Sequence, residues 1–136
     1  PFGRYTQPQF PLAEILNFHE KSQAAEFVLS DFRRTLSQVS GHAVVYCDPP
    51  YAPIDATSNF SDYTKEGFGP QDQKDLATAA RSLQGQGIPV VISNHDTDFT
   101  RALYENAKIE AFDVQRFISS KASNRKKAAE MLAVFA

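Results

Sequence analysis

The sequence predicts an α/β fold whose sheet is parallel at its centre and carries an antiparallel hairpin at its C-terminal edge. Apolar runs of strand length alternate with stretches that have helical spacing, and the last two predicted strands have no helix between them. Strands connected through helices lie parallel in one sheet, whereas strands connected by a loop alone lie antiparallel. In such sheets, ligands bind at the carboxyl ends of the strands.

The composition is that of one globular domain. The chain has 136 residues, of which 42% are hydrophobic and 22% are charged, and its net charge is −2. This charge neither requires nor excludes nucleic acid. No apolar run approaches the roughly 18–20 residues that span a bilayer, so we expect no membrane partner. A single cysteine and the absence of a recognisable signal peptide favour a reducing cytoplasm.

The first third of the chain holds two predicted helices and one predicted strand. Residues 1–11 contain three prolines and a glycine and are expected to form a loop. Residues 12–23 place apolar side chains at helical spacing, and residues 25–30 form an apolar run of strand length. Asp31 stands where a helix N-cap would, before a helix that we expect to end at Gly41.

The remaining elements alternate in the same way. Residues 42–47 are expected to form a buried strand and residues 52–69 a long functional loop. Pro70 begins a predicted helix, because proline is favoured at the first helical position. Residues 88–94 are a second buried strand, followed by the sequence HDTDF and a helix over 100–107. Apolar and polar residues alternate over 108–117, which predicts a strand with one solvent-exposed face. The tail, residues 126–136, is ambiguous between helix and strand, and we predict that it pairs with this strand as a hairpin.

The segment HAVVYCDPPY places an acid, two prolines and a tyrosine directly after a predicted strand. The exocyclic amine of adenine is a poor nucleophile because its lone pair is delocalised into the ring. Asp48 offers a carboxylate as one acceptor, and the carbonyl of Pro49, held stiffly by Pro50, offers a second. Two acceptors on the two amine hydrogens draw the nitrogen toward sp3 geometry. Tyr51 offers a face on which a flipped base can stack, worth roughly 1–3 kcal/mol.

Simpler interpretations exist for these residues. Asp-Pro-Pro is also an ordinary stop signal after a strand. Cys47 is expected to be a small strand residue and not a nucleophile, and His95 either lines the pocket or caps a loop. No spacing typical of metal ligands links the histidines and the cysteine, so no metal is expected.

Three segments in order, PFGRY, VVYCDPPYAPIDATSNF and IPVVISNHDT, together resemble the GATC-type DNA adenine methyltransferases of bacteria and their phages. The similarity covers essentially the whole chain, and the three motifs are more specific than DPPY alone. The resemblance implies a partial Rossmann-like methyltransferase sheet. It also implies transfer of a methyl group from S-adenosylmethionine to the exocyclic amine of adenine in double-stranded DNA, after base flipping.

The resemblance further implies how the chain is organised. In that family a glycine-rich cofactor loop and a DNA-recognition domain precede DPPY, and here no G-x-G follows a predicted strand. We therefore expect residues 1–11 to end the DNA-recognition hairpin segment and residues 12–136 to form the C-terminal part of the catalytic domain. The expected partners are double-stranded DNA and the missing N-terminal part of the same enzyme, in the cytoplasm at the nucleoid. Without that part, we expect the isolated chain to be inactive.

Residue roles also follow from the resemblance. Asp48, Pro49, Pro50 and Tyr51 match the catalytic motif, and Asp48 lies against the cofactor. The cofactor adenine is bordered in the family by a loop that corresponds here to Ser30, Asp31 and Phe32. The predicted DNA-binding residues are Pro1, Arg4, Tyr5, Asn124, Arg125 and Lys126.

Several alternatives to these roles stay open. Asp31 is equally explained as a helix cap, Arg4 as a solvated surface arginine, and residues 123–127 as a solvated loop. For the chain as a whole, one alternative is a truncated, non-catalytic fragment or weak DNA-binding module. Another is a methyltransferase acting on RNA or protein amines, against which Asp48 argues because those relatives tend to carry asparagine there.

Overall fold

The structure, a computed structural model, describes residues 10–54, 67–115 and 127–136. The chain divides into two compact units, Pro1–Ser30 and Asp31–Ala136. The described part of the first unit, residues 10–30, contains one helix, α1 (Leu12–Ser22), which confirms the helix predicted there. Glu14 in its first turn and Lys21 in its last complement the helix dipole.

The strand predicted over residues 25–30 is wrong, because the structure shows neither helix nor strand there. The side chains of Phe27, Val28 and Leu29 are exposed. Apolar composition alone does not make a strand, since strand backbone groups need a neighbour with which to pair. In the described part of the first unit there is no such neighbour.

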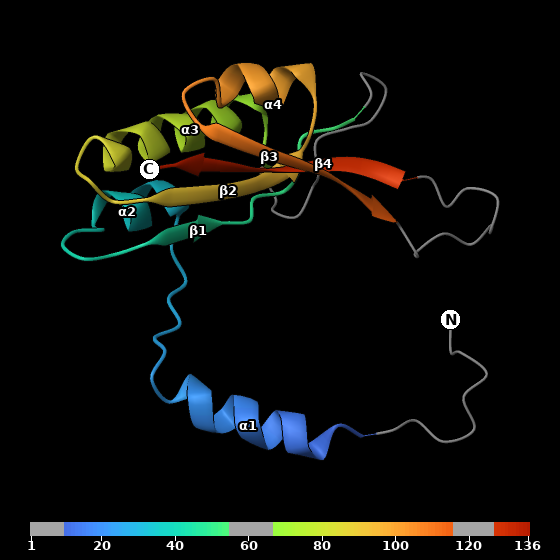
Figure 1. Cartoon of the computed structure of the whole chain (residues 1–136). Coiled ribbons are helices and arrows are strands. Elements are labelled where there is room, and N and C mark those ends of the chain that lie inside the picture. Colours follow the sequence, from blue (N-terminus) through green and yellow to red (C-terminus); the bar gives the residue numbers. More distant parts are fainter. Residues whose placement is uncertain (1–9, 55–66, 116–126) are drawn as a thin grey trace. The chain divides into compact units, whose positions relative to one another are not determined.

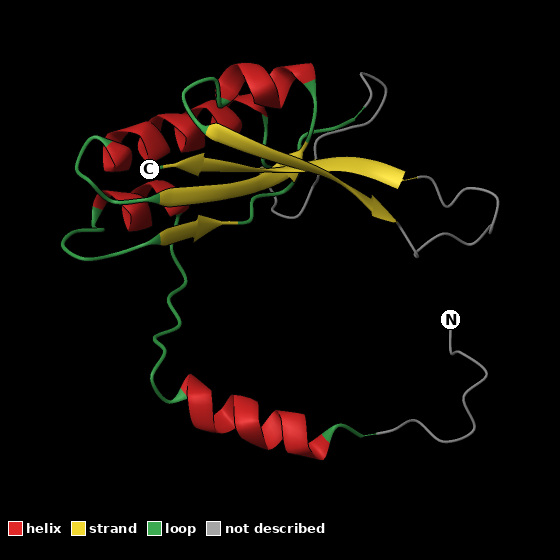
Figure 2. Ribbon diagram, in the orientation of Figure 1, coloured by secondary structure: helices red, strands yellow, loops and turns green. Residues whose placement is uncertain are grey.

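The second unit is built on a four-stranded sheet, shown in Figures 1 and 2. Its strands are β1 (Val45–Cys47), β2 (Val90–His95), β3 (Lys108–Gln115) and β4 (Lys127–Phe135), in the order β1-β2-β4-β3. β1 and β2 are parallel, whereas β4 is antiparallel to both β2 and β3. The predicted α/β fold class, with its parallel pair and its C-terminal hairpin, is thus confirmed, as is the strand predicted for the tail.

Among the described residues of this unit, three helices accompany the sheet: α2 (Phe32–Ser37), α3 (Pro70–Gln84) and α4 (Asp98–Leu103). α3 packs on β2 and β4, and Figure 2 shows α3 and α4 on the same face of the sheet. Pro70 begins α3 as predicted. α4 begins two residues before the predicted helix because the side chain of Thr97 caps it by accepting a hydrogen bond from the Thr100 amide. α2 ends at Ser37, before the predicted end at Gly41.

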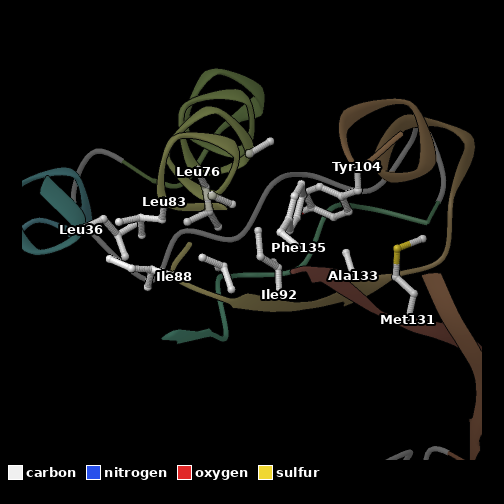
Figure 3. Packing of buried hydrophobic residues seen from close by; sticks show 12 residues of the cluster. Leu36, Leu76, Leu83, Ile88, Ile92, Tyr104, Met131, Ala133 and Phe135 are labelled. Atoms are coloured by element: carbon white, nitrogen blue, oxygen red, sulfur yellow. The ribbon is translucent and has the colours of Figure 1, made fainter. Parts of the chain in front are cut away.

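The hydrophobic core lies between α3 and the sheet (Figure 3). Helical spacing brings Leu76 and Leu83 to one face of α3, and alternation brings Ile92 of β2 and Phe135 of β4 to the facing side of the sheet. The segment 42–47, predicted as a buried strand, is less buried than expected, because Val44, just before β1, and Tyr46 within it expose 75% and 63% of their surface. Val45 and Cys47 pack against the core, so in the described structure only one face of β1 is covered.

Within the described ranges, the structure contains no helix that is both long and apolar enough to cross a membrane.

An ion-pair cluster joins α2 to α3. The guanidinium of Arg33 donates from Nη2 to Asp72 Oδ1 at 2.5 Å and to Asp75 Oδ2 at 2.6 Å. These bonds lower the pKa of both carboxyl groups. Leu36 of α2 also lies in the hydrophobic core, so the ion-pair cluster adds a polar connection between α2 and α3 to the apolar one.

We predict that Arg33→Gln destabilises the fold in a pH-dependent way. A carboxyl group whose pKa is lower in the folded state stabilises the fold at pH values above its unfolded pKa of about 3.9. This stabilisation is lost as the pH falls through the folded-state pKa. The urea midpoint of the variant should therefore lie below that of the wild type at pH 6–8, and the two should converge below about pH 4. Arg34→Gln, at an exposed position of the same helix, is the control. A difference between the two midpoints that did not narrow at all as the pH fell below about 4 would contradict the assignment.

Candidate active site

The predicted catalytic motif lies at the carboxyl end of the parallel strand pair. β1 ends at Cys47, which lies opposite Ile92 of β2, so Asp48 follows at the same edge as Ser93 and Asn94. This is the edge where an α/β sheet binds ligands. The structure therefore brings the two predicted segments, CDPPY and SNHD, together.

The carboxylate of Asp48 is oriented by a neighbouring strand. The hydroxyl of Ser93 donates to Asp48 Oδ1 at 2.6 Å, and the Cys47 carbonyl lies 3.3 Å from the same hydroxyl. A hydroxyl has one hydrogen to donate, and the shorter bond to a charged acceptor is the stronger. Ser93 is buried, so its rotamer is held by packing and the carboxylate is aimed by a rigid group.

The backbone after Asp48 is tied down by side chains from two other elements. Gln73 Nε2 of α3 donates to the Pro50 carbonyl at 2.8 Å. The Ala52 amide donates to Asn94 Oδ1 of β2, also at 2.8 Å. His95 Nδ1 lies 2.7 Å from the Ala52 carbonyl, and donates to it in the tautomer with hydrogen on Nδ1. These bonds support the loop-capping interpretation of His95.

The anchoring side chains form one buried polar network. Asn94 Nδ2 donates to Gln73 Oε1 at 3.0 Å and lies 3.1 Å from the hydroxyl of Tyr104. All three side chains are fully buried. Among the described residues, every buried side-chain nitrogen and oxygen has a hydrogen-bond partner. Burial raises the pKa of Tyr104 to about 12, so its hydroxyl stays neutral across the physiological range.

The ring of Tyr51 contacts the ring of His95 edge to face. The ring centroids are 4.9 Å apart, with an interplanar angle of 84°. Burial raises the pKa of Tyr51, and the negative charge of Asp48 adds to the effect. The tyrosine is therefore a neutral aromatic group beside the carboxylate, as a stacking platform requires.

The other predicted site residues have different outcomes. Asp31 caps α2, since its Oδ1 accepts a hydrogen bond from the Arg33 amide at 2.8 Å, and the ring of Phe32 lies 5.6 Å from that of Phe68. The cap interpretation is thus confirmed, and the cofactor role of Ser30, Asp31 and Phe32 stays a prediction. The predicted DNA-binding residues lie outside the described residues and stay predictions: Pro1, Arg4, Tyr5, Asn124, Arg125 and Lys126.

Sequence reasoning missed four residues that support the motif: Gln73, Ser93, Asn94 and Tyr104. A signal was present for Gln73, which lies three and four residues before Leu76 and Ala77 and thus on the buried face of α3. A polar residue at a buried helical position needs a partner.

Among the described residues, no group of three or more histidines, cysteines or acids could hold a metal ion.

Comparison with known proteins identifies the class of protein that this site belongs to. Residues 1–118 match the D12 class N6 adenine-specific DNA methyltransferase family. The chain therefore belongs to this family, and the resemblance seen in its motifs is confirmed.

Named relatives show the same similarity along nearly the whole chain. The sequence is 46% identical over 135 residues to the DNA adenine methylase of Escherichia coli K12, covering 99% of this chain and 49% of that protein. It is 45% identical over 136 residues to the DNA adenine methylase of Serratia marcescens, covering 99% and 50%. The Vibrio cholerae DNA adenine methylase is 43% identical over 136 residues, covering 99% and 49%. The chain thus spans about half the length of these relatives.

We predict that the buried Tyr104 makes the fold sensitive to alkali. Its folded-state pKa of about 12 exceeds the unfolded value of about 10. Between these values the unfolded chain binds fewer protons than the folded one, so stability falls with rising pH by up to about 1.4 kcal/mol per pH unit. Urea titrations at pH 9 to 11.5 should show a steeper loss for the wild type than for Tyr104→Phe. If the stabilities of the wild type and Tyr104→Phe fell in parallel with rising pH, the hydroxyl of Tyr104 would not be a buried neutral group in the folded state.

Proposed function

We propose that this chain supplies the adenine-binding motif of an enzyme that methylates the exocyclic amine of adenine in double-stranded DNA, within GATC, using S-adenosylmethionine. The observation that carries the proposal is the motif's position. Asp48 and Tyr51 lie at the carboxyl edge of a parallel strand pair, and the backbone of Pro50 and Ala52 is held there by buried side chains. The membership of the chain in an adenine-specific methyltransferase family supports the same substrate.

The chemistry assigned to the motif is activation of an amine. The carboxylate of Asp48 and the carbonyl of Pro49 accept the two amine hydrogens, which directs the nitrogen lone pair away from the ring. As the nitrogen forms its new bond it gains positive charge, and the carboxylate stabilises that charge electrostatically. The amine becomes acidic once it is methylated, so its proton leaves without an obligatory general base.

Tyr51 is assigned the role of base platform. A base inside a duplex cannot reach a protein carboxylate, so the adenine must be extruded from the stack before reaction. A neutral tyrosine ring beside Asp48 offers the extruded base a stacking surface. The edge-to-face contact with the ring of His95 restricts the orientation of the Tyr51 ring.

The methyl donor fits the described residues in part. The carboxylate of Asp48, oriented by Ser93, matches the positive charge of a sulfonium, and the partly buried ring of Phe32 offers an apolar contact of the kind that a nucleoside base needs. When bound, S-adenosylmethionine supplies an electrophilic methyl group. We propose that Ser30, Asp31 and Phe32 border its adenine, while a glycine-rich loop outside this chain holds the rest. We also propose that the predicted DNA-binding residues, Pro1, Arg4, Tyr5, Asn124, Arg125 and Lys126, contact the DNA and that the enzyme acts at the nucleoid.

In the complete enzyme we predict that Asp48→Ala lowers methyl transfer by at least about 10²–10³-fold, because one acceptor of the amine is lost. DNA affinity should change by less than about threefold, since the contacts proposed for Asp48 are with the reacting amine and the methyl donor and not with the DNA backbone. Ser93→Ala should reduce turnover to an intermediate level, because the carboxylate remains but is no longer aimed. Digestion of treated plasmid with methylation-sensitive restriction enzymes reports the product and its sequence. Turnover by Asp48→Ala near the wild-type level would contradict the role proposed for Asp48 as an acceptor of the amine.

A calorimetric titration tests whether the purified chain by itself carries a complete site for S-adenosylmethionine. If the chain depends on another part of the enzyme for the glycine-rich loop, it should bind S-adenosylmethionine only weakly when purified alone. We predict no measurable heat in a calorimetric titration at micromolar concentration. Micromolar binding by these 136 residues would show that the cofactor site is already present within them.

A further inference from the structure

We propose that Gln73 and Asn94 are positioning residues for methyl transfer, because together they clamp both peptide groups of Tyr51. The proposal rests on the function proposed above and extends it to two residues outside the catalytic motif. Neither side chain is required to touch the substrate. Their role is to fix the backbone from which the amine acceptor and the base platform project.

The clamp follows from which peptide groups are held. The Pro50 carbonyl, bound by Gln73, belongs to the peptide that precedes Tyr51. The Ala52 amide, bound by Asn94, belongs to the peptide that follows it. Tyr51 is thus held between two anchored peptide planes, and the direction of its side chain is restricted from both ends.

The same clamp reaches the amine acceptor. The Pro49 carbonyl is separated from the anchored Pro50 carbonyl by the φ and ψ angles of Pro50 alone. The pyrrolidine ring fixes φ near −65°, so a single rotatable angle remains. Holding the Pro50 carbonyl with a buried donor therefore also limits where the Pro49 carbonyl can point.

The hydrogen-bonding pattern permits only one orientation of the two amides. The Pro50 carbonyl needs a donor, so Gln73 must present its Nε2, and the Ala52 amide needs an acceptor, so Asn94 must present its Oδ1. The remaining atoms, Asn94 Nδ2 and Gln73 Oε1, are complementary and lie 3.0 Å apart. Rotating either amide by 180° would bring like groups together at two positions. The pair is therefore a unique arrangement joining α3, β2 and the loop after β1.

Two buried primary amides are a costly way to fill a core. Both are fully buried, and apolar residues of similar volume would avoid the desolvation of four polar groups. What polar pairs provide is a specific geometry, which apolar packing does not enforce. Catalysis by positioning needs such geometry, since a displacement of about 1 Å can cost on the order of 10²-fold in rate.

The test uses the complete enzyme carrying Gln73→Met, which keeps the side-chain volume but removes the donor to Pro50. We expect kcat to fall by at least about tenfold while KM for a GATC duplex changes by less than about threefold. The reason is that misplacing the groups that hold the adenine slows the chemical step without weakening duplex binding. The control is Leu83→Val, which loosens the core further along the same helix. If Gln73→Met does not fold, Gln73→Asn, whose amide is one methylene too short, replaces it.

Amide hydrogen exchange of Ala52 gives a second readout that does not depend on catalysis. Gln73→Met should speed this exchange by at least about tenfold relative to Leu83→Val, because the Asn94 amide loses its hydrogen bond to Gln73 and holds the Ala52 amide less firmly. Unchanged Ala52 exchange, or a fall in kcat no larger than that of Leu83→Val, would overturn the proposal. If the wild-type enzyme methylates no adenine, the proposed function fails, and the exchange result alone then decides whether the clamp exists.

Discussion

The site depends on one interaction, the hydrogen bond between the buried amides of Gln73 and Asn94. Each amide uses one end to hold its neighbour and the other to hold the backbone next to Tyr51. The loop over residues 48–54 contains three prolines and so has few amide hydrogens with which to form its own turns; its conformation is therefore set by hydrogen bonds from other elements. The rigid helix and strand on which the amides stand provide that conformation.

This arrangement separates the groups that react from the groups that hold them. Asp48 is exposed and Tyr51 is partly exposed, so a ligand can approach both, whereas the side chains that support them are buried and have hydrogen-bond partners. Parallel pairing of β1 with β2 makes the separation possible, because it brings Ser93 beside Asp48. One sheet edge thus carries both the chemistry and its support.

Much of the fold could be predicted because its signals are local: the proline that begins α3, the cap at Asp31 and the apolar alternation of the strands. The strand expected over residues 25–30 failed because strand formation depends on a neighbour that composition does not reveal. In the site, DPPY was recognisable from chemistry and from its resemblance to a family. Gln73 and Asn94 were not, because their role arises only when α3 and β2, distant in sequence, meet at the loop.

The central claim is that the rigid Pro49 carbonyl and the oriented Asp48 carboxylate each accept a hydrogen bond from the amine of an extruded adenine. A crystal structure of the complete enzyme with GATC duplex and a non-reactive analogue of the methyl donor tests it most directly. The adenine amine should lie within about 3.2 Å of both the Asp48 carboxylate and the Pro49 carbonyl oxygen, with the base stacked on Tyr51. An adenine that remained in the helix, or bound away from this edge, would contradict the claim.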